Sequence, residues 1–432
     1  MTHRIVIVGG GAGGVELATR LGKTMGRNFQ AKITLVDANM THLWKPLLHE
    51  VAAGSLNSTG DELNYVAQAK WNNFEFQYGR MCGLDRANKR IRLAAQPAQE
   101  DRAPLPEREL EYDTLVLSVG STTNDFGTPG AAENCIFLES RDQAERFRRL
   151  LLSHYLRAHA SNDDGHQVKV AIVGAGATGV ELAAELRHAS KELVAYGLER
   201  IPPENLSITL IESSPRVLAA LPERISRSAH ATLESLGVRV LVSTAVSEVT
   251  AEGVKTKDDQ FIPADLMVWA AGVRAPAFLK ELDGLETNRI NQLQVRQTLQ
   301  TTLDDDIFAF GDCASCPQPG TDRPVPPRAQ AAHQQASLLA KSLHRKLQED
   351  KPLLEYRYSD HGSLISLSSF SAIGNLMGNL TGNVTLEGWL ARKFYISLYR
   401  MHQMALYGTF RTLMMMLGDR FRSSTEPRLK LH

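Results

Sequence analysis

The chain has 432 residues, of which 43% are hydrophobic and 22% charged, a composition typical of a folded globular protein that excludes a disordered chain. Lys and Arg together number 48, as do Asp and Glu, so the formal net charge is zero and bulk electrostatics draws the chain to neither nucleic acid nor a membrane. Four cysteines are too few for a disulfide scaffold, no apolar run reaches the roughly 20 residues of a membrane-spanning helix, and the N-terminus lacks a signal-peptide layout, so we expect a cytoplasmic, non-spanning protein.

The chain opens with a buried strand, a glycine turn and a helix, predicted over residues 4–25 with the turn at 9–14. A second strand, over 32–37, ends at an acidic residue. The same order of elements returns at 169–186, followed by a strand over 207–212 that again ends at an acid. One βαβ unit therefore occurs twice in this chain.

The remaining segments fit around these two units. In chain order they are hairpin-like strands at 74–93, a Pro- and charge-rich connection at 94–111, buried strands at 114–121 and 265–273, a short apolar strand within 298–314, a Pro-rich loop at 317–327 and a helix at 329–347. We expect an α/β fold in which a second Rossmann-like domain, 165–289, is inserted into a discontinuous first domain, 1–120 and 290–350. Residues 351–432 form a separate C-terminal region rich in methionine and aromatic residues.

The two glycine turns predict two dinucleotide sites. In G-x-G-x-x-G after a strand, the first glycine permits a tight turn, the second lets the backbone approach a pyrophosphate, and the third lets helix and strand pack closely. These roles fall to two sets of glycines: Gly9, Gly11 and Gly14, and Gly174, Gly176 and Gly179. Each following helix offers unpaired N–H groups to phosphates. A single copy could be a turn without a ligand, but two copies in the same context argue against that.

Asp37 and Glu212 end the second strand of each unit, where a carboxylate can accept hydrogen bonds from ribose hydroxyls. Such a carboxylate repels a 2′-phosphate, so the second site is expected to prefer NADH to NADPH. Arg216, four residues later, is a basic residue that could bind such a phosphate, and we interpret it instead as a loop charge.

The paired units resemble the two-dinucleotide-binding flavoproteins, in which the N-terminal motif holds FAD and the inserted one holds NAD(P)H. Their third motif, an apolar strand ending in Gly-Asp, matches IFAFGDCA, with Gly311 and Asp312. The resemblance implies that Asp312 binds the flavin side of FAD. The strands that end in Gly120 and Gly272 match the linking motifs of these flavoproteins.

Further segments of the chain indicate which group of two-dinucleotide-binding flavoproteins it resembles. Residues 38–60 lack the C-x4-C pair of the disulfide reductases and contain Lys45, which could present a cation to the flavin. This segment, 329–336 and 398–418 resemble the type II NADH:quinone oxidoreductases, single-subunit enzymes that do not pump protons. The resemblance implies FAD, NADH as cosubstrate, a membrane quinone as acceptor, and peripheral attachment to the cytoplasmic face of the bacterial inner membrane. It leaves a homodimer open.

The resemblance also implies roles for particular side chains. Glu181 is expected near the nicotinamide and the flavin, whereas otherwise it would be a helix carboxylate stabilised by the dipole. Gln330 and His333 are three residues apart on a helix and share a face, where they are expected to position quinone and deliver protons. Relatives carry a cation near the quinone, for which Arg392 and Lys393 are both candidates.

Two alternatives remain at this point. A sulfide:quinone oxidoreductase needs cysteines flanking the flavin, and Cys135 and Cys313 do not form a matched pair. A flavoprotein with structural nucleotide binding would instead gate a partner interaction. We interpret the neighbouring pair Cys313 and Cys316 as small packing residues, with no metal site.

The C-terminal segment has a local basic excess, because residues 388–422 contain six Lys or Arg and one acid, Asp419. If one continuous helix spans them, Lys393, Arg400 and Arg411 lie on one face. Apolar and aromatic residues lie opposite. This pattern predicts a helix in the headgroup plane beside an anionic leaflet. The alternative is that the segment packs on the soluble core or in a dimer.

Overall fold

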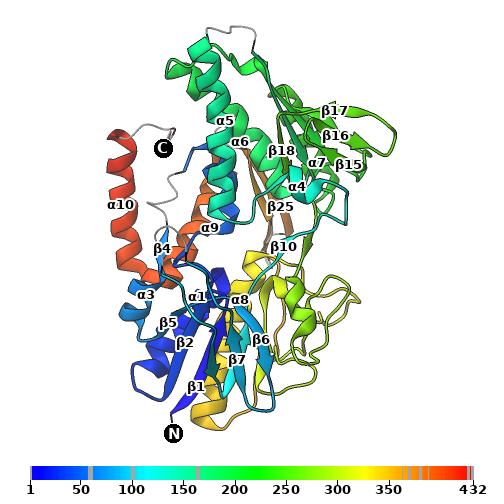
Figure 1. Cartoon of the computed structure of the whole chain (residues 1–432). Helices are drawn as coiled ribbons and strands as arrows, with labels where there is room; N and C mark the ends of the chain where they lie inside the picture. Colours follow the sequence, from blue (N-terminus) through cyan, green and yellow to red (C-terminus); the bar gives the residue numbers. More distant parts are fainter. Residues whose placement is uncertain are drawn as a thin grey trace. The chain divides into compact units, whose positions relative to one another are not determined.

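A computed structural model describes residues 2–56, 62–98, 103–161, 166–361, 363–367, 371–378, 382–387, 389–425 and 429 (Figure 1). The chain divides into two compact units. The first unit comprises Met1–Trp44, Glu62–Thr122 and Val273–Ser359, and the second comprises Lys45–Asp61, Thr123–Gly272 and Asp360–His432. The longest segment of the second unit, Thr123–Gly272, lies in sequence between two segments of the first unit.

The first unit is built on a parallel sheet of five strands, in the order β21-β9-β1-β2-β5. The strands are β1 (His3–Val8), β2 (Ala31–Asp37), β5 (Glu75–Tyr78), β9 (Thr114–Leu117) and β21 (Ile307–Ala309). Residues 5–8 of the central strand β1 are all buried, without the alternation of a half-exposed strand. A strand covered on both faces has this pattern. Helices α1 (Ala12–Leu21) and α8 (Ala329–Glu349) lie side by side in this unit (Figure 1).

Smaller elements complete the first unit. They are the π-helical turn Gly22–Gly26, α3 (Tyr65–Asn72), the antiparallel sheet β6 (Met81–Asp85), β7 (Arg90–Leu93) and β8 (Arg108–Glu111), and the short pairs β3 (Thr41–His42) with β4 (Leu63–Asn64) and β20 (Leu293–Gln294) with β22 (Ala314–Ser315). Residues 74–93 are therefore only partly a hairpin, because β5 joins the parallel sheet beside β2.

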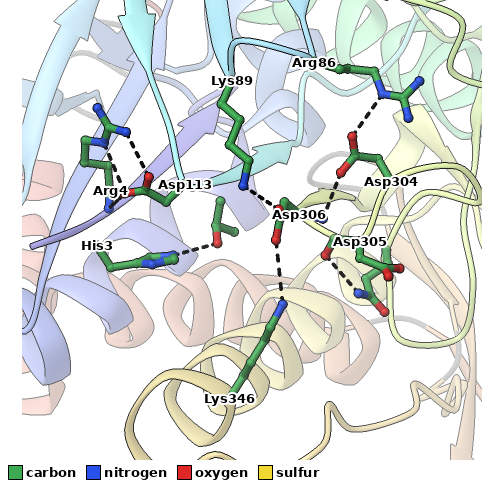
Figure 2. Close-up of polar contacts among 11 residues, drawn as sticks. His3, Arg4, Arg86, Lys89, Asp113, Asp304, Asp305, Asp306 and Lys346 are labelled. Carbon is green, nitrogen blue, oxygen red and sulfur yellow. Dashed lines mark hydrogen bonds and ion pairs between the residues drawn. The ribbon is translucent and has the colours of Figure 1, made fainter. Parts of the chain in front are cut away.

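Ion pairs link the elements at the amino ends of the parallel strands (Figure 2). Arg4 of β1 contacts Asp113, just before β9, at 2.9 Å. Asp306, just before β21, accepts from Lys89 at 2.6 Å and lies 3.9 Å from Lys346 of α8. These charges tie the strand starts of the first unit to the β6–β7 hairpin and to α8.

The second unit repeats the five-stranded parallel sheet, in the order β11-β18-β12-β13-β14. Its strands are β11 (Ile136–Phe137), β12 (Val168–Val173), β13 (Leu206–Ile211), β14 (Arg239–Leu241) and β18 (Leu266–Trp269). Its other elements before the C-terminal part are α2 (Leu48–Ala53), α4 (Ala131–Asn134), α5 (Arg141–Ser161), α6 (Ala177–Ala195), α7 (Glu223–Ser235) and the antiparallel β15 (Val246–Thr250), β16 (Gly253–Thr256) and β17 (Phe261–Pro263). The strand that carries the glycine turn is again central, as in the first unit.

The C-terminal part belongs to the second unit and does not form a unit of its own. It consists of the sheet β23 (Ser363–Leu367), β24 (Ser371–Gly378) and β25 (Gly382–Glu387) and the helices α9 (Trp389–Tyr407) and α10 (Thr409–Thr425). The physical reason is packing, because β23 contacts α6, and β24 contacts both α7 and α9.

The expectation of one continuous C-terminal helix is wrong. Gly408, with φ +82°, separates α9 from α10 because a left-handed residue ends an α-helix. Arg400 of α9 then pairs with Asp419 of α10 at 2.7 Å, so this cation does not lie on a common face with Arg411. Across the residues that the structure describes, no helix is both long enough and apolar enough to cross a bilayer.

Candidate functional site

The glycine turn between β1 and α1 has the geometry that the motif predicts. Gly9 has φ +99°, and a Cβ there would lie 2.4 Å from the Ser118 carbonyl oxygen. A Cβ at Gly14 would lie 1.8 Å from the Gly9 oxygen, so helix and turn pack without room for a side chain. A Cβ at Gly11 would meet no protein atom within 4 Å. The turn therefore has no room for a side chain at Gly9 or Gly14, whereas the space beside Gly11 is free of protein atoms.

Asp37 connects this turn to the end of β2. Its Oδ2 accepts from the Gly10 N–H at 2.6 Å, and its Oδ1 accepts from the Asn39 N–H at 2.7 Å. Burial raises the pKa of Asp37, although these hydrogen bonds oppose that shift. The buried Tyr65 binds the carbonyl of the same glycine, because its hydroxyl donates to the Gly10 oxygen at 2.6 Å.

The second unit repeats this arrangement. Gly174 has φ +102° and packs against Ala271, where a Cβ would lie 2.7 Å away. A Cβ at Gly179 would lie 2.0 Å from the Gly174 oxygen, and one at Gly176 would meet nothing within 4 Å. Both turns thus leave an open space beside a helix N-terminus, where backbone N–H groups lack helical partners.

Glu212 occupies the position of Asp37 in the second unit. Its Oε2 accepts from the Ala175 N–H at 2.8 Å and its Oε1 from the Ser214 N–H at 2.7 Å. Arg216 donates to the carbonyl oxygens of Leu221 at 2.9 Å and Ala219 at 2.8 Å. Its guanidinium thus takes part in the fold of its own loop.

The Gly311–Asp312 motif follows β21 and is held by three side chains of the first unit. Ser121 donates to Asp312 Oδ2 at 2.8 Å, and Gln292 donates to the Asp312 carbonyl oxygen at 3.0 Å. The Gly311 N–H donates to Gln335 of α8 at 2.8 Å.

The linking glycines Gly120 and Gly272 have φ of +72° and +69°, a conformation that favours glycine. Gly120 belongs to the first unit and Gly272 to the second.

Glu181 lies in a buried cluster of titratable groups in the second unit. It accepts from the Ser366 N–H at 3.0 Å and lies 3.6 Å from Nδ1 of His49 on α2. Burial raises the pKa of Glu181 to about 8, and the nearby Glu50 and Glu185 add to the effect. Burial also lowers the pKa of His49 to about 4, so this neighbour is neutral at pH 7 and does not stabilise a carboxylate charge. Glu181 can therefore hold a proton near neutral pH.

Gln330 and His333 both lie on α8, as predicted, in its first turn and a half. His333 Nδ1 contacts the carboxylate of Glu16, a fully buried residue of α1. Glu16 also accepts from Arg20 at 2.6 Å and from Ser337 at 3.1 Å. The predicted proton donor is thus paired with a buried acid from a helix far away in sequence.

Three predicted site residues, Lys45, Arg392 and Lys393, are not among the contacts described above. Lys45 begins a short 3₁₀ turn, Lys45–Leu47, that belongs to the second unit, so its assignment to FAD stays a prediction. The side chains of Arg392 and Lys393 lie outside the described residues.

Cys313 and Cys316 are fully buried, and burial raises their pKa to about 11 and about 12, so both are neutral thiols at pH 7. Within the described parts of the chain, no group of three or more His, Cys, Asp and Glu could hold a metal ion.

The residues present fit two dinucleotides. Each turn combines an open middle glycine, a helix N-terminus and a carboxylate at the end of the adjacent strand, which are the parts that bind a pyrophosphate and a ribose.

Sequence reasoning missed the supporting residues Glu16, His49, Tyr65 and Gln335. Gln335 follows Gln330 and His333 in the same motif, so its helical spacing was a usable signal, whereas the others are visible only through long-range contacts.

Comparison with known proteins agrees with this geometry. Residues 3–336 match the family described as pyridine nucleotide-disulphide oxidoreductase. The chain is 47% identical over 443 aligned residues to a type II NADH:quinone oxidoreductase of Haemophilus influenzae, with 99% of both chains covered. It is 28% identical over 383 residues to the protein of the same name from Staphylococcus aureus, which covers 87% of this chain and 90% of the relative.

Two solved structures share the fold of the chain. The structure of NDH2 from Plasmodium falciparum in complex with NADH matches with a TM-score of 0.84 at 17% identity, over 99% of both chains. The sulfide:quinone oxidoreductase from Aquifex aeolicus matches with a TM-score of 0.72 at 17% identity, over 94% of this chain and 92% of that one.

Proposed function

The chain belongs to the type II NADH:quinone oxidoreductases, within the pyridine nucleotide-disulphide oxidoreductase family, and from this premise we propose that it oxidises NADH and reduces a membrane quinone through bound FAD without pumping protons. The observation that supports the proposal most is the duplicated turn, because Asp37 and Glu212 each accept from a backbone N–H of their own glycine turn. Two dinucleotides on one chain are what a nicotinamide-dependent flavoenzyme requires.

The first unit supplies the FAD site in this proposal. When bound there, FAD would supply the chemistry of accepting a hydride from NADH and releasing its electrons to the acceptor. Gly11 and the N-terminus of α1 receive the pyrophosphate, and Asp37 receives the adenosine ribose. Ser121 and Gln292 hold Asp312 in place for the flavin side of the cofactor.

The second unit supplies the NADH site. Gly176 and the N-terminus of α6 receive the pyrophosphate, and the Glu212 carboxylate receives the ribose hydroxyls while repelling a 2′-phosphate. The hydrogen bonds of Arg216 to its own loop argue that it does not serve a 2′-phosphate. The site is accordingly selective for NADH.

Glu181, Gln330 and His333 are the proposed reacting-site residues. A quinol carries two hydrogens, whereas NADH delivers only one with its two electrons, so each turnover consumes one proton from the protein or solvent. Gln330 positions the quinone and His333 binds it and supplies that proton, while Glu181, whose pKa is raised to about 8, can carry a proton near the nicotinamide.

Helix α10 is the proposed contact with the membrane. Phe410, Leu413, Leu417 and Phe421 recur at helical spacing, and Phe410 and Phe421 have 76% and 75% of their surface exposed. An exposed apolar row of this kind suits the boundary between headgroups and acyl chains of an anionic leaflet. In α9, His402 and Leu406 are buried, so these two residues of the predicted apolar face do not take part in this contact.

The central experiment is a flavin assay of the purified full chain. We expect a yellow protein whose flavin absorbance is bleached by NADH under anaerobic conditions and restored by a soluble quinone. A protein that stays colourless after addition of FAD would overturn the proposal. Sulfide is the matched control donor. We expect it to bleach the flavin more slowly than NADH does, because the thiols of Cys135 and Cys313 are buried and neutral and so cannot act as sulfur carriers. Bleaching by sulfide faster than by NADH would favour the sulfide:quinone alternative.

A further inference from the structure

The contact between α1 and α8 contains a buried acid that the proposed chemistry has not used. Glu16 has no solvent exposure, lies on α1 two residues after the third glycine of the turn, and accepts hydrogen bonds from three side chains. Arg20 and Ser337 donate to its Oε1, at 2.6 and 3.1 Å, and His333 Nδ1 contacts its Oε2. A buried carboxylate with this many donors is an ionised acceptor.

The charges around Glu16 agree with that state. Burial alone raises the pKa of a carboxyl group, but the hydrogen bonds and positive charges of His333 and Arg20 outweigh burial here, so the pKa of Glu16 lies below its ordinary value. Among the described residues of α1 and of the 3₁₀ turn Gly311–Cys313, both of which pack against α8, the charged groups are Glu16, Arg20 and Asp312, and Ser121 binds Asp312.

An ionised Glu16 determines the tautomer of His333. The carboxylate can only accept, so Nδ1 must carry a hydrogen, and any exchange of a proton is left to Nε2. The His333 side chain is 38% exposed, so water can return a proton to the ring. A buried carboxylate that orients a histidine is a common device for fixing which nitrogen reacts.

We propose that Glu16 is a positioning residue for quinone reduction, which holds His333 protonated on Nδ1 so that Nε2 delivers the proton the reaction consumes. The inference rests on the proposed function. In this step the Nε2–H bond of the protonated ring breaks, an O–H bond forms on the quinone, and the neutral ring regains a proton from water. The electrons come from NADH through the bound cofactor, and Glu16 stays ionised throughout.

The test compares Glu16→Gln and His333→Gln in the FAD-loaded full chain. A matched control pair lies on the same helix, where His344 and Glu349 form a half-exposed contact at 3.7 Å; His344→Gln and Glu349→Gln should behave as wild type. Stopped-flow absorbance separates reduction of the flavin by NADH from its reoxidation by a soluble quinone, and each is followed from pH 5 to pH 9.

We expect both test variants to keep the wild-type rate of flavin reduction by NADH. Reoxidation by quinone should fall at least tenfold in His333→Gln and in Glu16→Gln at pH 7.5, and the double variant should be no slower than His333→Gln. In Glu16→Gln the pH at which reoxidation falls off should be lower than in wild type, because a neutral amide stabilises the imidazolium less than a carboxylate does.

Other outcomes overturn the inference. If Glu16→Gln lowers melting temperature and FAD affinity but leaves the pH profile of reoxidation unchanged, Glu16 is a structural cross-link between α1 and α8. If Glu16→Gln and His333→Gln are both indistinguishable from wild type in reoxidation, neither residue serves proton delivery. Failure of the proposed function is a separate result, because wild-type protein would then show no flavin reduction by NADH.

Discussion

Glu212 is the residue on which the choice between NADH and NADPH depends in the proposed function. Glu212→Gln keeps the shape of the side chain and removes its charge, so repulsion of a 2′-phosphate disappears. We expect the ratio of kcat/KM for NADH to that for NADPH to fall about 10- to 100-fold, since a hydrogen bond to a charged group contributes about 1.5–3 kcal/mol. Steady-state kinetics with both nucleotides measures the ratio.

The structure adds a second effect to this substitution. An amide has one acceptor oxygen, so either the Ala175 or the Ser214 N–H loses its partner, and KM for NADH should also rise. Glu223→Gln, on the exposed start of α7, is the control and should leave the ratio unchanged. A wild-type enzyme that used both nucleotides equally well would contradict the assignment of Glu212.

Glu181 should make the stability of the protein depend on pH in a defined direction. Its pKa is raised to about 8 in the folded chain, against an ordinary value of about 4.5, so the folded state binds a proton more tightly than the unfolded state does. The stabilisation is present in full below about pH 4.5 and is lost as the pH rises through about 8. We expect the melting temperature of wild type to drop between pH 6 and pH 9 by several degrees more than that of Glu181→Gln, which cannot ionise.

Thermal unfolding at several pH values measures this difference, and Glu223→Gln again serves as the control because its carboxyl is exposed. His49, whose pKa is lowered to about 4, is present in both wild type and Glu181→Gln, so its own contribution to the pH dependence cancels in the comparison. If the melting temperatures of wild type and Glu181→Gln changed equally with pH, ionisation of the Glu181 carboxyl would not destabilise the folded chain.

At the scale of elements, the β6–β7 hairpin is held to the strand starts of the first unit by Arg86 (Figure 2). Its guanidinium donates to Asp304 at 3.0 Å and to the carbonyl oxygens of Asp283 and Leu303. Arg86→Ala should lower the free energy of unfolding by roughly 1.5–3 kcal/mol, because these acceptors lose a charged donor.

Arg90 of the same hairpin is the matched control. It pairs with Glu109 and Glu111, but all three side chains are about half exposed, so Arg90→Ala should cost about 0–1 kcal/mol. Urea unfolding of both variants gives the comparison. Equal losses would mean that burial and the number of acceptors do not decide the strength of these contacts.

Helix α10 gives a second prediction at this scale. Replacing Phe410, Leu413, Leu417 and Phe421 together by Ser removes the exposed apolar row, and we expect at least a tenfold loss of sedimentation with anionic liposomes while FAD content is kept. Phe261→Ser, at another exposed aromatic position, should bind as wild type does. Substitution is preferable to truncation before Gly388, because the buried His402 and Leu406 of α9 make that segment part of the second unit. Unchanged binding would exclude α10 as the anchor.

At the scale of the whole molecule, the proposed function divides the cofactor and the cosubstrate between the two units. Gly11 and Gly176 have φ of −58° and −72°, ordinary for any residue, and a Cβ at either meets no protein atom within 4 Å. Alanine at these positions should therefore leave the fold intact and intrude only on a bound pyrophosphate. Gly11→Ala should lower FAD affinity at least tenfold, whereas Gly176→Ala should retain FAD and raise the NADH concentration needed for bleaching.

The third glycines give the contrasting control. Alanine at Gly14 or Gly179 would lie within 2.0 Å of a backbone oxygen, so those variants should lose thermal stability. Fluorescence titration of FAD and anaerobic titration with NADH measure the two affinities. If Gly11→Ala and Gly176→Ala affect both ligands equally, the division between the units is wrong.

The sequence by itself determined the features that depend on neighbours along the chain. The strand, glycine turn and helix at residues 4–25, their repeat at 169–186, and the acids Asp37 and Glu212 are local patterns set by backbone sterics and by burial of a central strand, and the structure has them where they were predicted. The break at Gly408 was local as well, but the assumption of one continuous helix passed over the glycine signal.

Only the tertiary structure decided which charges meet. Glu16 and His333 are 317 positions apart, and their contact exists because α1 and α8 pack side by side in the first unit. Glu181 meets His49 because α2 packs on α6, and burial there, which no pattern in the sequence encodes, raises the pKa of the one group and lowers that of the other. Charge pairing and desolvation depend on distances in space, and those follow only once the helices are packed.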